Sequence, residues 1–382
     1  MKGVVISCDT RSASVPRVVS EQIQTTMNSS VDEDMSNVPH IELNLVHERI
    51  EEGAIEILKN IRPDWNIKDV NFRVFTNGIT NKLLGCFNSS CKTDGILVRV
   101  YGHNTDLMID RKAETRNFKL LQGAGYAPPL YATFTNGLAY KFVPGIVLTE
   151  DLVRSPKVYP MIARMVACIH KLDYGISVTR SPSLWKKCAK YISLIPNTYS
   201  KNEKQSKYLN IVKGGVDFLR QELDSLESNL REQESPIVFC HNDLLLGNII
   251  LEEDSVTFID YEYASYNYQA FDIGNHFDEF AGVATVDYSL YPDRDLQWDW
   301  LRIYLEEYNC DIENYQVTEK DIERLYVQVN KFAIAASFMW GVWSLVQAHV
   351  SDIDFDFMDY ADIRLTDYFS RKEEVLSLTL PR

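Results

Sequence analysis

The 382-residue sequence predicts an α+β fold in two lobes, with a small β-rich N-lobe and a larger, mainly helical C-lobe. Strand-like segments bounded by glycines dominate residues 72–143. Pro144-Gly145 interrupts the chain where this pattern ends, and helical spacing of apolar residues follows up to the C-terminus. One compact strand–loop–strand unit at residues 236–260 breaks the helical part. We therefore place the lobe boundary at Pro144-Gly145.

The length of the chain exceeds what one ordinary hydrophobic core requires, which also favours two lobes. Residues 1–40 are rich in Ser, Val, Thr and Asn and contain few aromatic residues, a composition typical of a flexible tail. The remaining chain divides into an N-lobe at residues 41–143 and a C-lobe at residues 144–382.

Within the N-lobe, apolar residues recur at helical spacing from Glu42 to Ile61, and a second helix is predicted at 110–122. Residues 72–87 predict two strands around a glycine-bearing turn, and residues 95–102 predict a third strand. Residues 130–143 predict a hairpin, with Asn136-Gly137 as the turn because these residues favour positive φ.

The C-lobe is predicted to be helical at 151–173 and 182–231, and again from residue 261 onward. The apolar stretch at 332–350 is about long enough to cross a bilayer. Polar residues interrupt it, and no cluster of Lys or Arg flanks it. We expect a buried helix of a soluble protein and no stable membrane insertion.

Charge and cysteine usage exclude several classes of function. The formal net charge of −15 argues against a nucleic-acid partner, because phosphate binding requires a basic face. The seven cysteines are scattered without a C-x-x-C pair, which fits a reducing compartment better than a disulfide framework. The N-terminal residues lack the pattern of a signal peptide. We expect a cytoplasmic protein, and a homodimer is compatible with the sequence.

The most specific motif lies in SPIVFCHNDLLLGNIILEEDSVTFIDYE, residues 235–262. A predicted hairpin brings His241, Asp243 and Asn248 of a polar loop beside Asp260 at the end of the returning strand. H-x-D-x-x-x-x-N followed by a strand-borne Asp is the catalytic-loop arrangement of protein kinases. It supplies a carboxylate that orients the attacking hydroxyl group and oxygen ligands for magnesium. Asp243 is therefore the predicted base, and Asn248 and Asp260 are the predicted Mg²⁺ ligands.

Two N-lobe features agree with phosphoryl transfer from ATP in a protein-kinase-like fold. The segment TNGITNK at residues 76–82 lies between two strands and can place backbone N–H groups over phosphates, although a plain hairpin turn has the same pattern. Arg99 occupies the strand position of the phosphate-binding lysine of protein kinases, and Glu114 on the next helix is its predicted partner. A surface ion pair is the alternative. Because Tyr261-Glu262 replaces Phe-Gly after Asp260, the chain is not a protein kinase.

These motifs closely resemble the choline/ethanolamine kinase family. The resemblance rests on CHNDLLLGNII and FIDYEYASYNYQAFDIGNHFDEFAG, and on FTNGITNKLLGCF, LVRVYG, VDYSLYPDRDLQ and SFMWGVWSLVQA. It extends over roughly residues 45–370. The sequences TNGITNK, CHNDLL and DEFAGV resemble those of ethanolamine kinases rather than those of choline kinases. A pocket tyrosine of choline kinases has no counterpart near Ala284.

The resemblance implies further site residues. The ATP-phosphate loop is expected at Asn77, Gly78, Ile79, Thr80, Asn81, Lys82 and Leu83. Arg99 and Asp260 are expected to contact the ATP phosphates and their metal, and the backbone of Lys141, Phe142 and Val143 to read the adenine. The amino-alcohol pocket is expected at Asp243, Tyr263, Asn275, Glu279, Trp340, Trp343, Phe355 and Tyr360.

The residues give an independent reason for this pocket. Aromatic faces and a carboxylate hold a cationic group, and Trp340 and Trp343 lie three residues apart on one predicted helix face. Core packing is the alternative role of both tryptophans. Asp272 and His241 are expected to support the catalytic loop rather than react.

The sequence therefore predicts an ethanolamine kinase that uses ATP and Mg²⁺ and produces phosphoethanolamine for phosphatidylethanolamine biosynthesis. A choline kinase or a dual choline/ethanolamine kinase is the nearest alternative. Another kinase acting on a larger amine, such as an aminoglycoside, shares the catalytic loop but lacks the WGVWSLVQA stretch. A pseudokinase requires the loss of a catalytic group, and none is missing.

Overall fold

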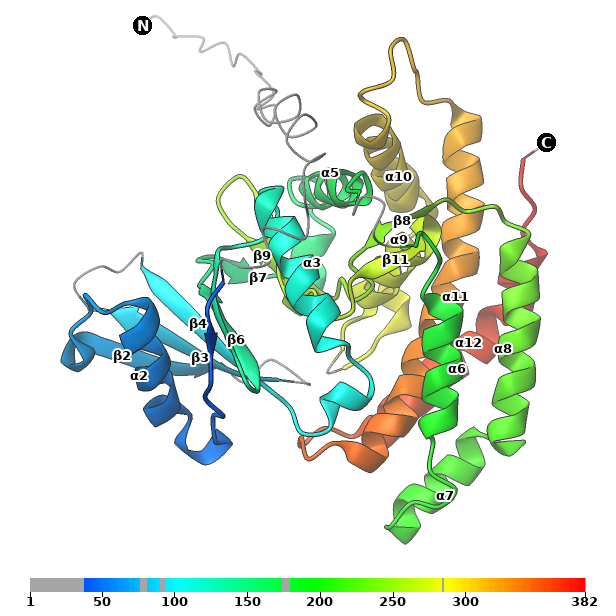
Figure 1. Cartoon of the computed structure of the whole chain (residues 1–382). Helices are drawn as coiled ribbons and strands as arrows, with labels where there is room; N and C mark the ends of the chain where they lie inside the picture. Colours follow the sequence, from blue (N-terminus) through cyan, green and yellow to red (C-terminus); the bar gives the residue numbers. More distant parts are fainter. Residues whose placement is uncertain (1–37, 76–80, 90–93, 174–178, 284, 382) are drawn as a thin grey trace, which may run out of the picture. The chain divides into compact units, whose positions relative to one another are not determined.

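The computed structural model describes residues 38–75, 81–89, 94–173, 179–283 and 285–381 (Figure 1). Residues 38–382 form one compact unit. Most of the predicted tail, residues 1–37, lies outside the described residues, and so does the predicted turn at 76–80. The described part combines a β-sheet lobe with a helical lobe, as the α+β prediction requires.

The N-lobe is built on a six-stranded sheet of order β1-β5-β6-β4-β3-β2, antiparallel except for the β1–β5 pair. Its strands are β1 (His40–Ile41), β2 (Val70–Phe75), β3 (Asn81–Asn88), β4 (Gly95–Tyr101), β5 (Leu130–Phe134) and β6 (Gly137–Lys141). Two helices accompany the sheet, α2 (Ile50–Ile61) and α3 (Arg111–Gly123). The predicted helix at 110–122 and the predicted strands of this lobe are confirmed.

Strand β4 is buried on both faces, and its alternation determines where Arg99 points. Ile96, Val98 and Val100 belong to the small core beneath α2. Leu97 faces the other way and belongs to the large core that continues into the helical lobe. Because successive side chains of a strand alternate between faces, Arg99 points to the same side as Leu97, toward the C-lobe.

Two details of the N-lobe differ from the sequence prediction. The first helix begins at Ile50 after a short 3-10 turn, not at Glu42, because Leu45 forms backbone hydrogen bonds with the Asn136 side chain. The β5–β6 hairpin exists, but its turn residues are Thr135 and Asn136, and neither has positive φ. Gly137 is needed for another reason: a Cβ there would lie 2.1 Å from the Arg99 carbonyl oxygen.

The C-lobe contains two small sheets and a set of helices. One sheet has the order β10-β9-β7 and the other pairs β11 with β8. The strands are β7 (Ile146–Val147), β8 (Ile237–Cys240), β9 (Ile249–Leu251), β10 (Val256–Phe258) and β11 (Ser265–Tyr268). The helices are α4 (Glu150–Val153), α5 (Tyr159–His170), α6 (Leu184–Leu194), α7 (Asn202–Ile211), α8 (Gly215–Arg231), α9 (Gln269–Asp278), α10 (Arg294–Tyr308), α11 (Glu319–Val350) and α12 (Phe357–Ser377).

The prediction of helices alone after residue 260 was wrong, because Ser265–Tyr268 forms β11. This strand pairs antiparallel with β8, so the segment after the catalytic hairpin returns beside the strand that precedes it. A four-residue strand is too short to show a recognisable alternation of apolar and polar residues, so its pairing with a distant strand could not be predicted.

Helix α11 is the centre of the C-lobe. It is the one described helix long and apolar enough to cross a membrane, and its apolar window is entirely buried within the protein. It packs against α9 and α12 (Figure 1). The predicted buried helix is confirmed. The contact with α9 is close at Gly274, where a Cβ would lie 2.7 Å from the Val329 carbonyl oxygen and 2.8 Å from the Ala333 nitrogen.

We expect Gly274→Ala to destabilise the protein by about 1–3 kcal/mol, because backbone atoms of α11 cannot move away from the added methyl group. Gly123→Ala is the matched control, since Gly123 ends α3 and nothing lies within 4 Å of its Cβ position. Urea unfolding measures both variants. An equal free energy of unfolding for Gly274→Ala and the wild type would contradict the close α9–α11 contact.

Candidate active site

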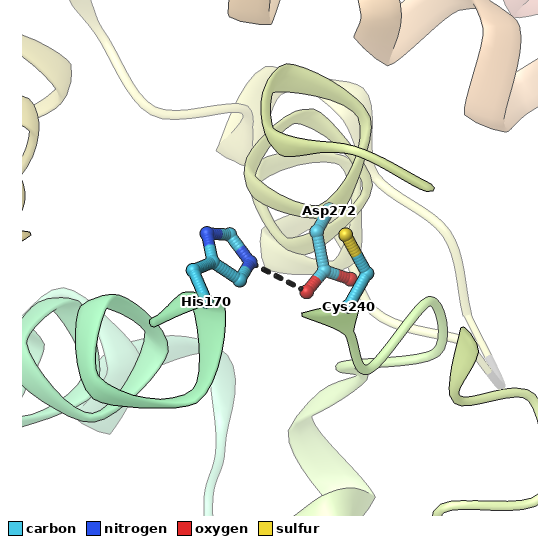
Figure 2. A group of neighbouring side chains, drawn as sticks. All are labelled: His170, Cys240 and Asp272. Atoms are coloured by element: carbon cyan, nitrogen blue, oxygen red, sulfur yellow. Dashed lines mark hydrogen bonds and ion pairs between the residues drawn. The ribbon is translucent and has the colours of Figure 1, made fainter. Parts of the chain in front are cut away.

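The loop after β8 is held by the carboxylate of Asp272 on α9. Its Oδ2 accepts the backbone N–H of His241 (2.9 Å), and its Oδ1 accepts the backbone N–H of Asn242 (2.6 Å). The Nε2–H of His170 on α5 also donates to Oδ2 (3.0 Å; Figure 2). Burial favours the protonated acid, but the hydrogen bond from His170 keeps the pKa of Asp272 below its ordinary value. Asp272 thus has the supporting position that the sequence suggested.

His170, Cys240 and Asp272 lie close enough together to resemble a metal site (Figure 2). Burial raises the pKa of the Cys240 thiol well above its ordinary value. The Cys240 thiol lies within hydrogen-bond distance of the Val238 and Tyr268 carbonyl oxygens (3.5 and 3.7 Å). Because the His170 nitrogen that faces Asp272 is already a hydrogen-bond donor, these residues form a structural hydrogen-bond group.

His241 is fixed as a neutral imidazole. Its Nε2 must donate to the Ile259 carbonyl oxygen (3.0 Å), because a carbonyl only accepts. Its Nδ1 must then accept the backbone N–H of Asp243 (3.3 Å). Burial lowers the pKa of His241, which also favours the neutral ring. Neither ring nitrogen remains for proton transfer, so His241 links the loop to the end of the β9–β10 hairpin.

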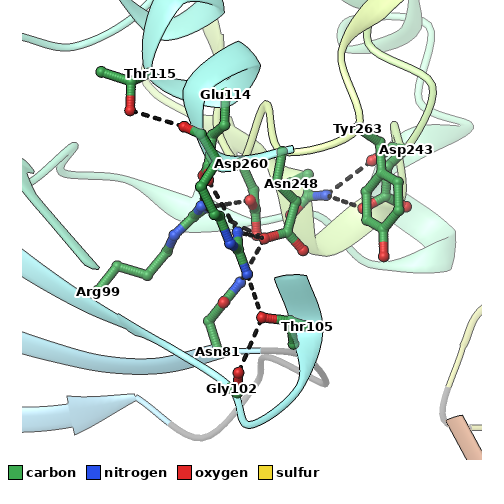
Figure 3. A network of polar contacts seen from close by, with 12 residues as sticks. Asn81, Arg99, Gly102, Thr105, Glu114, Thr115, Asp243, Asn248, Asp260 and Tyr263 are labelled. Atoms are coloured by element: carbon green, nitrogen blue, oxygen red, sulfur yellow. Dashed lines mark hydrogen bonds and ion pairs between the residues drawn. The ribbon is translucent and has the colours of Figure 1, made fainter. Parts of the chain in front are cut away.

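Asp243 and Asn248 adjoin within the same loop (Figure 3). The Asn248 amide donates to the Asp243 backbone carbonyl (2.8 Å) and to the Asp243 carboxylate (3.3 Å). Burial, followed by the negative charges of Asp260 and Glu279, raises the pKa of Asp243 well above its ordinary value. Asp243 lines the cavity together with Asn248 and Asp260. The role of Asp243 as the base stays a prediction.

Asp260 and Arg99 connect the two lobes. Asp260 follows the β9–β10 hairpin with φ of 63°, a conformation that non-glycine residues adopt where function or packing imposes it. The Arg99 guanidinium forms ion pairs with Asp260 and Glu114 (Figure 3). It also forms an ion pair with Glu262. The predicted Arg99–Glu114 pair is present, and it is buried rather than on the surface. Contact of Arg99 with ATP phosphates stays a prediction.

The sequence analysis missed Glu262 and Arg111 as members of this cluster. Glu262 accepts from Arg111 (3.0 Å) and from the Asn81 amide (3.0 Å). Burial favours the neutral acid, but Arg99 and Arg111 lower the pKa of Glu262 below its ordinary value. Glu262 thereby joins the C-lobe to the first residue of β3. The only signal in the sequence was its place after Asp260, where it was noted merely as a departure from protein kinases.

Asn248 and Asp260 fit the requirements of a magnesium site. Both supply oxygen atoms, both line the same cavity, and the Asn248 amide nitrogen is used within the loop, which leaves its oxygen. The neighbouring group of Glu114, Asp260 and Glu262 is less suitable, because Arg99 already pairs with all three carboxylates.

A cavity of about 330 Å³ runs past the catalytic loop and contains residues of both predicted sites. Of the residues predicted to contact the nucleotide, Leu83, Phe142, Val143 and Asp260 line it, whereas Lys141 does not. The backbone N–H groups of Lys141 and Phe142 donate to Pro129 and Gly95, and the Val143 N–H has no partner among the described residues. Lys82 donates to the His47 carbonyl. Residues 77–80 lie outside the described residues.

Another group of lining residues is aromatic and acidic. It consists of Asp243, Tyr263, Glu279, Trp340, Trp343 and Tyr360. The Trp340 and Trp343 rings, 5.3 Å apart, lie edge to face, and their indole N–H groups donate to Asn275 and Tyr263. Asn275 is thus behind the wall, and Phe355 packs on Tyr360 without lining the cavity.

Glu279, which was predicted to line the amino-alcohol pocket, is paired with an arginine. Arg364 of α12 donates to its Oε1 (2.6 Å), and both side chains are buried. Burial raises the pKa of Glu279, and Arg364 opposes this shift. Arg364 was not predicted, because it lies 85 residues after Glu279 and no local pattern indicates the contact.

The sequence profile described as choline/ethanolamine kinase matches residues 72–369. The chain belongs to the choline/ethanolamine kinase family. Human Ethanolamine kinase 1 is 46% identical over 337 residues, which are 87% of this chain and 74% of that protein. The solved structure of a Plasmodium vivax ethanolamine kinase superposes with a TM-score of 0.73 at 30% identity, covering 85% of this chain and 89% of that one.

A solved choline kinase from Cryptosporidium parvum superposes on this member of the choline/ethanolamine kinase family with a TM-score of 0.72. It is 23% identical and covers 85% of this chain and 96% of that one, so it shares the fold. The predicted family, the two-lobed protein-kinase-like fold and the predicted class of enzyme, an ATP-dependent kinase, are confirmed.

We expect acid destabilisation through His276, whose Nδ1–H donates to the Leu244 carbonyl of the catalytic loop. Burial lowers the pKa of His276 to about 4, so between pH 6.5 and 4 only the unfolded chain binds this proton. Stability is lost as the pH falls through that window, by up to about 3 kcal/mol from this group. His276→Asn, which keeps an N–H donor, should flatten the dependence in urea unfolding at several pH values. Equal pH slopes for both proteins would contradict the assignment.

Proposed function

We propose that this chain is an ethanolamine kinase, which transfers the ATP γ-phosphate to the hydroxyl group of ethanolamine. The observation that carries the proposal is one cavity whose lining includes Asp243, the predicted hinge residue Val143 and both tryptophans. Such a cavity can hold a nucleotide on one side and a small amino alcohol on the other. The curated relatives of this chain named ethanolamine kinase support the choice of acceptor.

The proposed mechanism assigns one task to each part of the cavity. Asp243 accepts a hydrogen bond from the substrate hydroxyl and orients its oxygen for in-line attack on the γ-phosphorus. Its carboxylate takes up the hydroxyl proton as the new P–O bond forms and the bond to the ADP leaving group breaks. Asn248 and Asp260 would hold Mg²⁺, which supplies charge neutralisation at the phosphates. The hinge at 141–143 and the loop at 77–83 are the proposed contacts to the nucleotide, and Arg99 is the proposed contact to its phosphates.

The ammonium group of the substrate is proposed to lie against Trp340, Trp343, Tyr263 and Tyr360. A cation over an aromatic face gains about 0.5–2 kcal/mol, depending on how far it is desolvated. Tyr263 and Trp340 meet edge to face at 5.3 Å, so these ring planes are already fixed relative to each other. A preorganised wall of this kind avoids the entropy cost of ordering side chains when substrate binds.

Choline remains the second candidate, since the same aromatic walls can accept a quaternary ammonium. Ala284, where choline kinases have a pocket tyrosine, lies outside the described residues. The cytoplasmic location, the homodimer and the lobe limits at 41–143 and 144–382 stay predictions. The proposed substrate is a small molecule, and the proposed pathway is phosphatidylethanolamine biosynthesis.

We expect kcat/KM for ethanolamine to exceed that for choline when purified protein is assayed with both amines at the same Mg²⁺ and ATP concentrations. The physical reason is that a protonated primary amine can add N–H hydrogen bonds to the aromatic contacts, and choline cannot. Equal or greater efficiency with choline would reject ethanolamine as the preferred acceptor but leave the kinase activity intact. Failure to phosphorylate either amine would reject the proposed function.

A further inference from the structure

Arg364 is a buried cation directly behind the proposed amine site. It lies on α12, none of its side chain is exposed, and it does not line the cavity. Its Nη2 donates to the Glu279 carboxylate and to the Tyr360 hydroxyl, and both of these residues do line the cavity. The guanidinium also lies 4.9 Å from the centre of the Tyr360 ring. Arg364 therefore determines the positions of two walls of the site.

The hydrogen bonds of Glu279 are incomplete. Oε1 accepts from Arg364, but the buried Oε2 has no hydrogen-bond partner among the described residues. A buried carboxylate oxygen without a donor is costly, and most such groups in proteins are satisfied. Since Glu279 lines the cavity, a substrate ammonium group can supply an N–H to Oε2.

The charge of Arg364 changes what Glu279 offers to a cation. Without Arg364, Glu279 would attract any ammonium group through its full negative charge. With Arg364 paired at Oε1, the two charges largely cancel, and the remaining attraction depends on a directed hydrogen bond at Oε2. An ammonium group with at least one N–H can form this bond, whereas a trimethylammonium group has no donor.

We propose that Arg364 is a positioning residue that sets the selectivity of the site for ammonium groups bearing an N–H over quaternary ammonium groups. This inference rests on the proposed function and names the feature of the acceptor that the site recognises. Along the series of increasingly methylated amines, the last N–H is lost between N,N-dimethylethanolamine and choline. We therefore expect the largest fall in kcat/KM at this step. Steric exclusion alone would instead lower the efficiency with each added methyl group.

The size of the effect follows from one hydrogen bond between charged groups. Such a bond contributes about 1.5–3 kcal/mol, which corresponds to roughly 10- to 150-fold in kcat/KM. For the wild type we expect kcat/KM to fall about tenfold or more from N,N-dimethylethanolamine to choline, which we call the final drop. The fall in kcat/KM between successive amines that retain an N–H should be smaller.

Arg371 provides a matched control on the same helix. It pairs with Asp278 (3.0 Å), the residue immediately before Glu279, and also with Asp367. It therefore forms the same kind of ion pair with a buried carboxylate of the same segment. Its ion-pair partners do not line the cavity. Loss of Arg371 should lower stability without altering the choice of amine.

The experiment measures kcat and KM for ethanolamine, its N-methyl and N,N-dimethyl derivatives and choline, beside a thermal melt of each protein. Arg364→Met should lower the KM for choline about tenfold, because Glu279 then attracts any ammonium group through its full charge. The KM for ATP should stay nearly unchanged, and the fall in kcat/KM from N,N-dimethylethanolamine to choline should shrink to less than about threefold. Arg364→Lys, which keeps the charge and one donor, should restore part of the drop. Tyr360→Phe, which keeps the ring and removes the hydroxyl partner of Arg364, should shift selectivity in the same direction by a smaller factor.

If Arg364→Met does not fold, the final drop in kcat/KM measured for Tyr360→Phe decides whether the inference holds. The inference is overturned if folded Arg364→Met and Tyr360→Phe keep the wild-type drop, or if Arg371→Met abolishes it equally. It is also overturned, with the kinase activity intact, if the wild type uses choline and N,N-dimethylethanolamine equally well. A wild type that phosphorylates none of the four amines overturns the proposed function and this inference together.

Discussion

The carboxylate of Asp272 is the constraint on which the arrangement of the active site depends. It accepts the backbone N–H groups of two consecutive residues, His241 and Asn242, and Asn242 has a φ of 65°. A left-handed conformation at a non-glycine residue costs free energy and persists only where its surroundings fix it. Asp243 follows directly, so the position of the proposed base is set from α9, which packs against the central helix α11.

The second constraint is electrostatic and joins the lobes. Three carboxylates, Glu114, Asp260 and Glu262, surround the guanidinium groups of Arg99 and Arg111. Removing one partner from such a buried group leaves an uncompensated charge, which is strongly destabilising. Asp260 is the most exposed of the three carboxylates, with 23% of its side chain accessible. It is therefore the member of the cluster that can serve both Arg99 and a magnesium ion.

The sequence predicted features with a local pattern and missed those that depend on distant contacts. The proximity of His241, Asp243, Asn248 and Asp260 could be predicted because one short hairpin brings these residues together. The pairings of Glu262 with Arg111 and of Glu279 with Arg364 join residues 151 and 85 positions apart, and charged residues occur too often for such pairs to be recognised. The helix start at Ile50 was missed for the same reason, since it is Asn136, far along the chain, that holds Leu45 outside the helix.

Substitution of Asp243 by Asn tests the central claim, that this carboxylate orients the attacking hydroxyl group, most directly. We expect kcat with ethanolamine to fall roughly 10²- to 10⁴-fold, while calorimetric binding of a non-hydrolysable ATP analogue with Mg²⁺ stays close to wild type. Asp254→Asn, at an exposed carboxylate in the turn between β9 and β10, is the control and should keep its activity. Near-normal kcat in a folded Asp243→Asn protein would contradict the account.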